Sequence, residues 1–173
     1  LIKLSSRGPI FYGHLRIGRN GRRFRAWKFR TMVPNADQIL RDYLEFHPEL
    51  REEWERDQKL KNDPRVTRVG LLLRKTSLDE LPQLWNVLRG EMSLIGPRPI
   101  VSDEVEKYAE MFELYKKVLP GITGLWQVSG RNGTTYRDRV LLDAYYVRNW
   151  SVWLDLCILT KTVLVVLRRD GAY

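Results

Sequence analysis

The chain has 173 residues, of which 43% are hydrophobic, so it is long enough to form one ordinary domain with a core. Its single cysteine excludes an internal disulfide, and two histidines with that cysteine do not provide the ligand spacing of a zinc site. The net charge is +9, yet residues 33–61 carry −3, so the rest of the chain carries +12. This charge suits nucleic acid, an anionic membrane surface or a phosphorylated substrate.

A β-hairpin is predicted near the N-terminus, because Asn20-Gly21 separates two stretches of alternating character. Its second arm, residues 22–32, alternates basic with aromatic side chains. Such alternation is compatible with a ribbon that binds nucleic acid. The alternative is a solvated basic strand whose aromatic rings lie in the core.

Helical segments are predicted along much of the chain. Residues 35–47 and 48–60 read as two amphipathic helices that meet at Pro48. Residues 68–75 are predicted to form a short amphipathic piece, and residues 101–117 a helix rich in charge.

Two adjacent carboxylates, Asp79 and Glu80, are the first candidate functional residues. Ser77 precedes Glu80 by three positions, which is the spacing of a capping box, and the stretch to Leu88 suits a helix that ends at Gly90. Adjacent helical residues point about 100° apart, so the two acids cannot aim at one atom. We expect one nucleophile and one metal ligand; the alternative is that both acids merely cap the helix.

Arg98 is the second candidate, because Pro97 and Pro99 restrict its backbone on both sides. A planar guanidinium presented in this way suits a pair of phosphate oxygens. The alternative is a rigid surface turn with an incidental arginine.

Residues 120–132 are predicted to be a glycine-containing loop whose backbone amides can approach a ligand. Cations beside carboxylates favour phosphoryl chemistry over simple anion capture.

The C-terminal segment Trp150 to Leu167 is almost wholly apolar. As a helix, residues 152–167 would be roughly 24 Å long, which is short of the roughly 30 Å hydrocarbon core of a bilayer. Asp155 and Lys161 interrupt it as well. We therefore expect an amphipathic helix at the membrane surface rather than a spanning helix.

Four runs of the sequence, in this order, resemble the bacterial sugar transferases, which are polyprenyl-phosphate phosphoglycosyl transferases with a single membrane domain. The runs are Lys28 to Met32, Thr76 to Val87, Ser93 to Pro99, and Pro120 to Gly124 continuing through Gly130 to Asn132. The resemblance covers essentially all 173 residues.

The resemblance implies transfer of a sugar 1-phosphate from a UDP-sugar to undecaprenyl phosphate, with Mg²⁺, at the cytoplasmic face of the bacterial inner membrane. It places the nucleophile, which forms a phosphosugar-aspartyl intermediate and releases UMP, on Asp79, and a magnesium ligand on Glu80. It places phosphate-binding cations on Lys28, Arg74 and Arg98, and nucleotide-sugar-binding residues on Gln127, Arg131 and Asn132.

The expected fold is α+β and mostly α: one β-hairpin with short helices and the C-terminal surface helix. The resemblance implies that residues 1–173 form a single catalytic domain, and that a hydrophobic helix precedes Leu1 in a longer protein. It also implies that residues 33–61 match an insertion found in some members of the family. Those members initiate O-antigen, capsule or exopolysaccharide synthesis with galactose or glucose 1-phosphate. A homo-oligomer is left open. Two alternative functions remain: a basic module that binds nucleic acid, and a non-catalytic membrane-docking domain. The resemblance itself implies no nucleic-acid partner.

Overall fold

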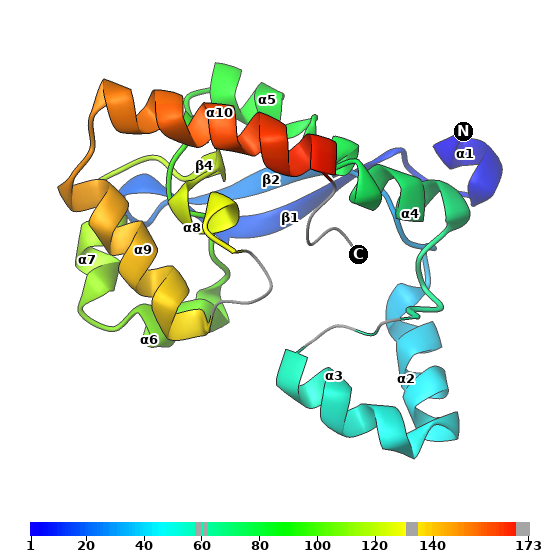
Figure 1. Cartoon of the computed structure of the whole chain (residues 1–173). Coiled ribbons are helices and arrows are strands. Elements are labelled where there is room, and N and C mark those ends of the chain that lie inside the picture. The colour runs from blue at the N-terminus through cyan, green and yellow to red at the C-terminus, as the bar shows by residue number, and fades with distance from the viewer. Residues whose placement is uncertain (58–59, 61, 131–134, 169–173) are drawn as a thin grey trace.

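A computed structural model describes residues 1–57, 60, 62–130 and 135–168, and the predicted α+β architecture with predominant helices is confirmed in these residues (Figure 1). The helices are α1 (Ile2–Ser5), α2 (Ala36–Phe46), α3 (Arg51–Asp57), α4 (Arg68–Lys75), α5 (Gln83–Leu88), α6 (Val105–Tyr108), α7 (Met111–Tyr115), α8 (Leu125–Val128), α9 (Tyr136–Arg148) and α10 (Val152–Arg168). Short 3₁₀ turns are η1 (Arg19–Gly21), η2 (Pro48–Leu50), η3 (Leu78–Glu80) and η4 (Ser102–Glu104).

The predicted hairpin is confirmed: β1 (Phe11–Ile17) pairs antiparallel with β2 (Arg23–Phe29). Asn20 and Gly21 both have left-handed backbone angles, with φ of 58° and 72°, which is why this dipeptide suits the turn. On β2, Phe24 is buried against Met92, so this ring belongs to the core rather than to an exposed stacking surface.

A second, smaller sheet was not predicted. Strands β3 (Ser93–Ile95) and β4 (Gly121–Thr123) pair in parallel. The prediction of a loop over residues 120–132 was therefore wrong for its described part, which contains β4 and α8; residues 131 and 132 lie outside the described residues. A Cβ atom at Gly121 would lie 2.1 Å from the backbone nitrogen of Gly96, so glycine is needed where the two chain segments approach.

The predicted charged helix over residues 101–117 was also wrong. The segment is divided into η4, α6 and α7, and Ala109, between the two helices, has a φ of 45°. Tertiary contacts outweigh helical propensity here, because the hydroxyl groups of two buried tyrosines bond to separate elements. Tyr108 donates to Asp143 of α9, and Tyr115 donates to the backbone oxygen of Ile17 in β1.

The helices expected around Pro48 and over residues 68–75 are confirmed as α2, η2 with α3, and α4. In Figure 1 the α2–α3 pair extends away from the hairpin and the other helices. Helix α4 is capped by Thr67, whose side chain accepts a hydrogen bond from Gly70. The backbone N–H of Thr67 donates to the backbone oxygen of Thr31, two residues beyond the end of β2. A Cβ atom at Gly70 would lie 1.9 Å from the backbone oxygen of Thr31.

Helix α10 is amphipathic, but much of its apolar surface faces outward while polar side chains contact the rest of the protein. Two of its polar side chains turn inward: Asp155 accepts hydrogen bonds from Tyr146 and Trp150, and Thr162 bonds to Thr123 of β4. Thr160 and Lys161 are exposed. The rest of its exposed side is apolar and comprises Val152, Trp153, Leu156, Leu159, Val163, Leu164 and Leu167. Among the described residues, no helix combines the length and the hydropathy needed to span a bilayer.

Candidate active site

The carboxylate pair lies on η3, between α4 and α5. At the end of α4 the chain reverses through Ser77, which has a left-handed φ of 55° and makes no capping hydrogen bond with its side chain. The predicted capping box was therefore wrong, and α5 begins only at Gln83. Glu80 instead pairs with Lys28 of β2, with 2.6 Å between Nζ and Oε1.

Asp79 lies beside the same lysine, with 3.9 Å between its Oδ2 and Lys28 Nζ. The Asp79 side chain is 13% exposed, against 26% for Glu80. Burial raises the pKa of Asp79, and the positive charge of Lys28 opposes this increase. The dyad is thus asymmetric: one carboxylate is largely desolvated and the other forms a tight ion pair.

Predicted residues from distant parts of the chain meet at one pocket. Lys28, Glu80, Arg98 and Gln127 all line it, and so does Arg16 of β1, which was not singled out from the sequence. We call this the hairpin pocket. The Nε2 group of Gln127 donates to the backbone oxygen of Ile122, which fixes this side chain at the pocket wall.

The remaining predicted residues are placed differently. Arg74 does not line the hairpin pocket; its Nε donates to Thr31 Oγ1 at 3.0 Å. The charge of Arg74 nevertheless acts on Asp79, where it opposes the increase in pKa that burial causes. Arg131 and Asn132 lie outside the described residues, so their predicted role in donor binding stays a prediction.

Asn86, on α5, fixes the hairpin relative to the dyad and was missed. It is fully buried, its Oδ1 accepts from the Trp27 N–H at 3.0 Å, and its Nδ2 donates to the Arg25 carbonyl at 2.8 Å and to Glu91 at 2.6 Å. These bonds from Asn86 to the backbone of Arg25 and Trp27 set the position of β2, and hence of Lys28 on the same strand. The sequence offered a weak signal, since an amide between apolar helical residues needs partners when buried.

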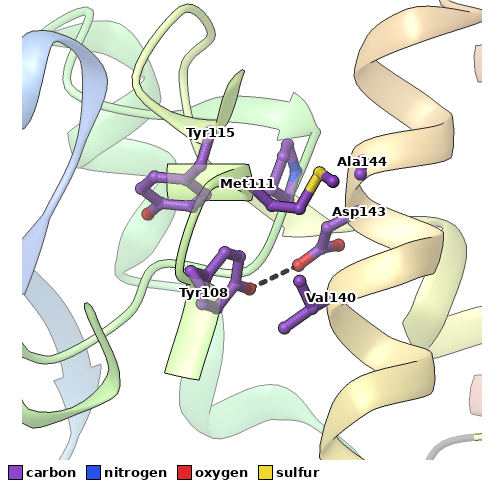
Figure 2. A pocket seen from close by; sticks show the side chains of 7 residues that line it. Tyr108, Met111, Tyr115, Val140, Asp143 and Ala144 are labelled. Atoms are coloured by element: carbon purple, nitrogen blue, oxygen red, sulfur yellow. Dashed lines mark hydrogen bonds between the residues drawn. The ribbon is translucent and has the colours of Figure 1, made fainter. Parts of the chain in front are cut away.

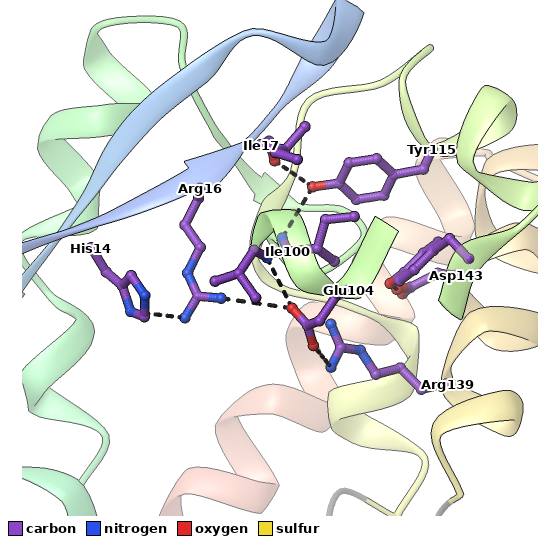
Figure 3. Close-up of polar contacts among 10 residues, drawn as sticks. His14, Arg16, Ile17, Ile100, Glu104, Tyr115, Arg139 and Asp143 are labelled. Carbon is purple, nitrogen blue, oxygen red and sulfur yellow. Dashed lines mark hydrogen bonds and ion pairs between the residues drawn. The ribbon is translucent and has the colours of Figure 1, made fainter. Parts of the chain in front are cut away.

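A polar network connects the hairpin pocket to α9 (Figure 3). Glu104 bonds to the N–H of Val101, lies 3.8 Å from Arg16 Nη1 and accepts from Arg139 Nη1 at 3.2 Å. Burial alone would raise the pKa of Glu104, but the Val101 hydrogen bond and the arginines hold that pKa below its usual value. Strand pairing is the signal that could have found Arg16, since Arg16 and Lys28 lie on one face of the hairpin.

Asp143 lies next to this network in the core. Figure 2 shows it on α9 together with Tyr108, whose hydroxyl donates to Asp143 Oδ2 at 2.7 Å. Burial raises the pKa of Asp143 to about 7, although the Tyr108 hydrogen bond opposes the increase. The cavity beside it is also lined by Pro97, so this carboxyl group packs directly behind the loop that presents Arg98.

The donor set of the dyad fits a magnesium ion. Magnesium prefers oxygen ligands and commonly uses one or two protein carboxylates, with substrate phosphates and water completing its shell. Glu80, which lines the hairpin pocket, supplies one such carboxylate, and Asp79, the predicted nucleophile, lies beside it near the same lysine. The part of the chain that the structure describes contains no cluster of three or more acidic, histidine or cysteine residues that could hold a metal ion. A magnesium ion at the dyad would therefore need ligands from the substrate and water as well.

The fold and site thus define a small α+β domain with a carboxylate dyad beside a cationic pocket suited to phosphate groups. Comparison with known proteins narrows this class: a family model described as bacterial sugar transferase matches residues 1–169, and the chain belongs to that family.

Three similar proteins show how the chain relates to curated relatives. It is 60% identical over 166 residues to an undecaprenyl-phosphate galactose phosphotransferase of Salmonella typhimurium, covering 96% of this chain and 35% of that protein. It is 52% identical to the exopolysaccharide production protein ExoY of Rhizobium meliloti, covering 100% and 76%. It is 41% identical to a UDP-glucose:undecaprenyl-phosphate glucose-1-phosphate transferase of Escherichia coli, covering 99% and 36%. The chain therefore spans about a third of the first and third of these proteins.

Proposed function

We propose that this chain is the catalytic part of a phosphoglycosyl transferase that moves a sugar 1-phosphate from a UDP-sugar to undecaprenyl phosphate. The observation that carries the proposal is the position of Asp79, largely buried and 3.9 Å from Lys28, beside a pocket lined by Lys28, Arg98 and Arg16. Relatives named as galactose and glucose phosphotransferases support a UDP-hexose as donor and the lipid phosphate as acceptor.

The proposed reaction has two steps. An Asp79 carboxylate oxygen attacks the sugar-linked phosphorus, the bond from that phosphorus to the bridging oxygen breaks, and UMP leaves with the electron pair. A phosphate oxygen of the lipid then attacks the same phosphorus, and the Asp79–phosphorus bond breaks. Neither nucleophile has a proton to lose, so the site needs cations more than a general base. This requirement agrees with the lysine and arginines around the hairpin pocket.

Magnesium is part of the proposal. Glu80 would hold it together with the donor phosphates, and the ion would supply neutralisation of charge on the phosphate oxygens. Within the protein, Lys28 favours the ionised form of Asp79 and orients Glu80 through its ion pair. Arg98 contributes a permanently charged guanidinium to the same pocket.

Attachment to a membrane surface is the second part of the proposal. The apolar side of α10 is exposed, and α5 adds exposed Leu84, Trp85 and Leu88. Both helices pack against β3, so their exposed apolar side chains belong to neighbouring elements. An exposed apolar surface of this kind, in a chain with net charge +9, suits an anionic interface and supports a site that works near a lipid phosphate. We place it at the cytoplasmic face of the bacterial inner membrane.

A single-turnover assay tests the covalent step. With UDP-hexose, Mg²⁺ and no lipid, the enzyme should release up to one equivalent of UMP and carry the phosphosugar mass on the peptide containing Asp79. Asp79→Asn should abolish both signals, whereas the matched control Asp103→Asn, an exposed acid in another 3₁₀ turn, should not. Full turnover by Asp79→Asn would instead support direct transfer to the lipid. Binding of nucleic acid with no UMP release would favour the rival module.

A further inference from the structure

Arg16 lines the hairpin pocket, but the proposed chemistry above assigns it no particular phosphate. It comes from β1, and the hairpin register pairs it with Phe24, while Lys28 pairs with Tyr12. Paired side chains lie on the same face of a hairpin, and so do side chains an even number of residues apart on one strand. Arg16 and Lys28 therefore occupy one face of the hairpin, near opposite ends of the ladder. Both line the hairpin pocket together with Arg98.

The Arg16 side chain is held rather than loose. It is 13% exposed, its Nη2 lies 3.2 Å from His14 Nδ1, and its Nη1 lies 3.8 Å from Glu104 Oε2 (Figure 3). Burial, followed by the charges of Arg16, Lys28 and Arg98, lowers the pKa of His14, so a neutral imidazole can accept from Arg16. A long side chain held in this way loses little freedom when it binds a ligand.

Positive charge exceeds negative charge around Arg16. Glu104 faces two guanidinium groups, those of Arg16 and Arg139, and Arg98 also acts on it. Arg139 is 9% exposed, and among the described residues its Nε and Nη2 have no hydrogen-bond acceptor. Asp143 also acts on Arg139 and Arg98, so two carboxylates face three arginines. This leaves a cationic excess next to a pocket, which is the arrangement expected where an anion binds.

The pocket therefore has two cationic parts. Lys28 is committed to the dyad through Glu80 and Asp79, whereas the nearest carboxylate to Arg16 is one that it shares with Arg139. A phosphosugar transfer involves more than one phosphate: the one that is attacked, the one that leaves with the nucleoside, and the one on the lipid. Lys28, Arg98 and the proposed magnesium ion serve the phosphates of the donor, so a further cation in the pocket suits a phosphate that leaves or arrives.

We infer that Arg16 binds a substrate phosphate other than the one that Asp79 attacks. The ligand is a phosphate monoester carrying about two negative charges near neutral pH: the departing UMP or the lipid phosphate. The inference rests on the proposed function for the identity of these ligands. Glu104 and His14 hold the Arg16 guanidinium in the orientation in which it meets that phosphate.

Equilibrium binding of UMP, measured by calorimetry without turnover, is the first arm of the test. Arg16→Gln should weaken UMP binding about tenfold or more, the size expected for the loss of charge-assisted hydrogen bonds. Arg16→Lys, which keeps the charge but loses the fork, should fall between this variant and the wild type. The matched control is Arg25→Gln, which removes the same charge from an exposed position on the other face of the hairpin and should change UMP affinity less than about twofold.

The second arm measures turnover at varied undecaprenyl phosphate in nanodiscs. If Arg16 contacts the lipid phosphate, Arg16→Gln should raise the KM for the lipid about tenfold or more and leave UMP binding and the single-turnover UMP burst intact. Unfolding by urea checks that each variant is folded. Unchanged UMP affinity together with an unchanged KM for the lipid in Arg16→Gln would overturn the inference. A wild-type protein that binds UMP through Arg16 but releases none from any UDP-hexose would overturn the proposed function and leave the inference standing.

Discussion

Removing the Asn86 side chain should destabilise the protein strongly, because three hydrogen bonds converge on this fully buried amide. Asn86→Ala leaves the Trp27 N–H and the Arg25 carbonyl without their partner, and each buried unsatisfied group costs about 1–3 kcal/mol. Loss of the bond to Glu91, which is partly exposed, adds about 1 kcal/mol. We expect a total of about 3–7 kcal/mol, a large share of the roughly 5–15 kcal/mol by which most domains are stable.

Urea unfolding followed by far-UV circular dichroism measures this loss. Asn149→Ala is the matched control, because that exposed amide makes one bond, to the backbone oxygen of Tyr145, and its removal should cost less than about 0.5 kcal/mol. Asn86→Asp keeps the acceptor for Trp27 but places a carboxylate beside Glu91, so its destabilisation should grow as pH rises from about 4 to 7. An Asn86→Ala variant within about 1 kcal/mol of the wild type would refute this account of how the hairpin is fixed.

Three further outcomes are expected. Burial raises the folded-state pKa of Asp143 to about 7, above its ordinary value, so this carboxyl lowers stability as pH rises from about 4 to 7. Asp143→Asn should remove that dependence, up to about 1.4 kcal/mol per pH unit, in urea unfolding at several pH values; identical slopes would contradict it. Ser77→Gly should raise stability by about 0.5–1 kcal/mol in the same assay, because glycine adopts the left-handed φ at no cost; a loss would show that the hydroxyl has a role. Trp153→Ser combined with Leu164→Ser should reduce co-sedimentation with anionic liposomes at unchanged stability, and equal sedimentation would remove α10 from the proposed membrane surface.

Local signals in the sequence predicted the elements whose conformation is set locally. Asn20-Gly21 gave the hairpin because both residues adopt left-handed angles, and Gly90, with a φ of 69°, follows the end of α5 as expected. The capping box failed because its glutamate has a better partner 52 residues away, Lys28, than the backbone of its own turn. Strands of three residues, such as β3 and β4, carry no periodic pattern long enough to detect.

The candidate site could be predicted only in part for the same reason. Glu80 and Arg98 are predicted from the local sequence and Lys28 and Gln127 from the family resemblance, and the structure brings all four to one pocket. Arg16 carries no local signal of its own, since a lone arginine on a strand is usually a solvated residue. It becomes visible only once the register of the hairpin is known, which places its side chain on the same face as Lys28.

The 3₁₀ turn also explains how two adjacent carboxylates can have different roles. Successive residues of such a turn point about 120° apart, so Asp79 and Glu80 cannot share one environment. Glu80 turns to Lys28 and the pocket, while Asp79 lies deeper, where burial raises its pKa and Lys28 opposes the increase. A desolvated carboxylate is a stronger nucleophile than a hydrated one, provided that a nearby cation keeps it ionised. Because Lys28 contacts both acids, the lysine that keeps Asp79 reactive is the same one that holds Glu80 in place, and the dyad depends on the hairpin for both functions.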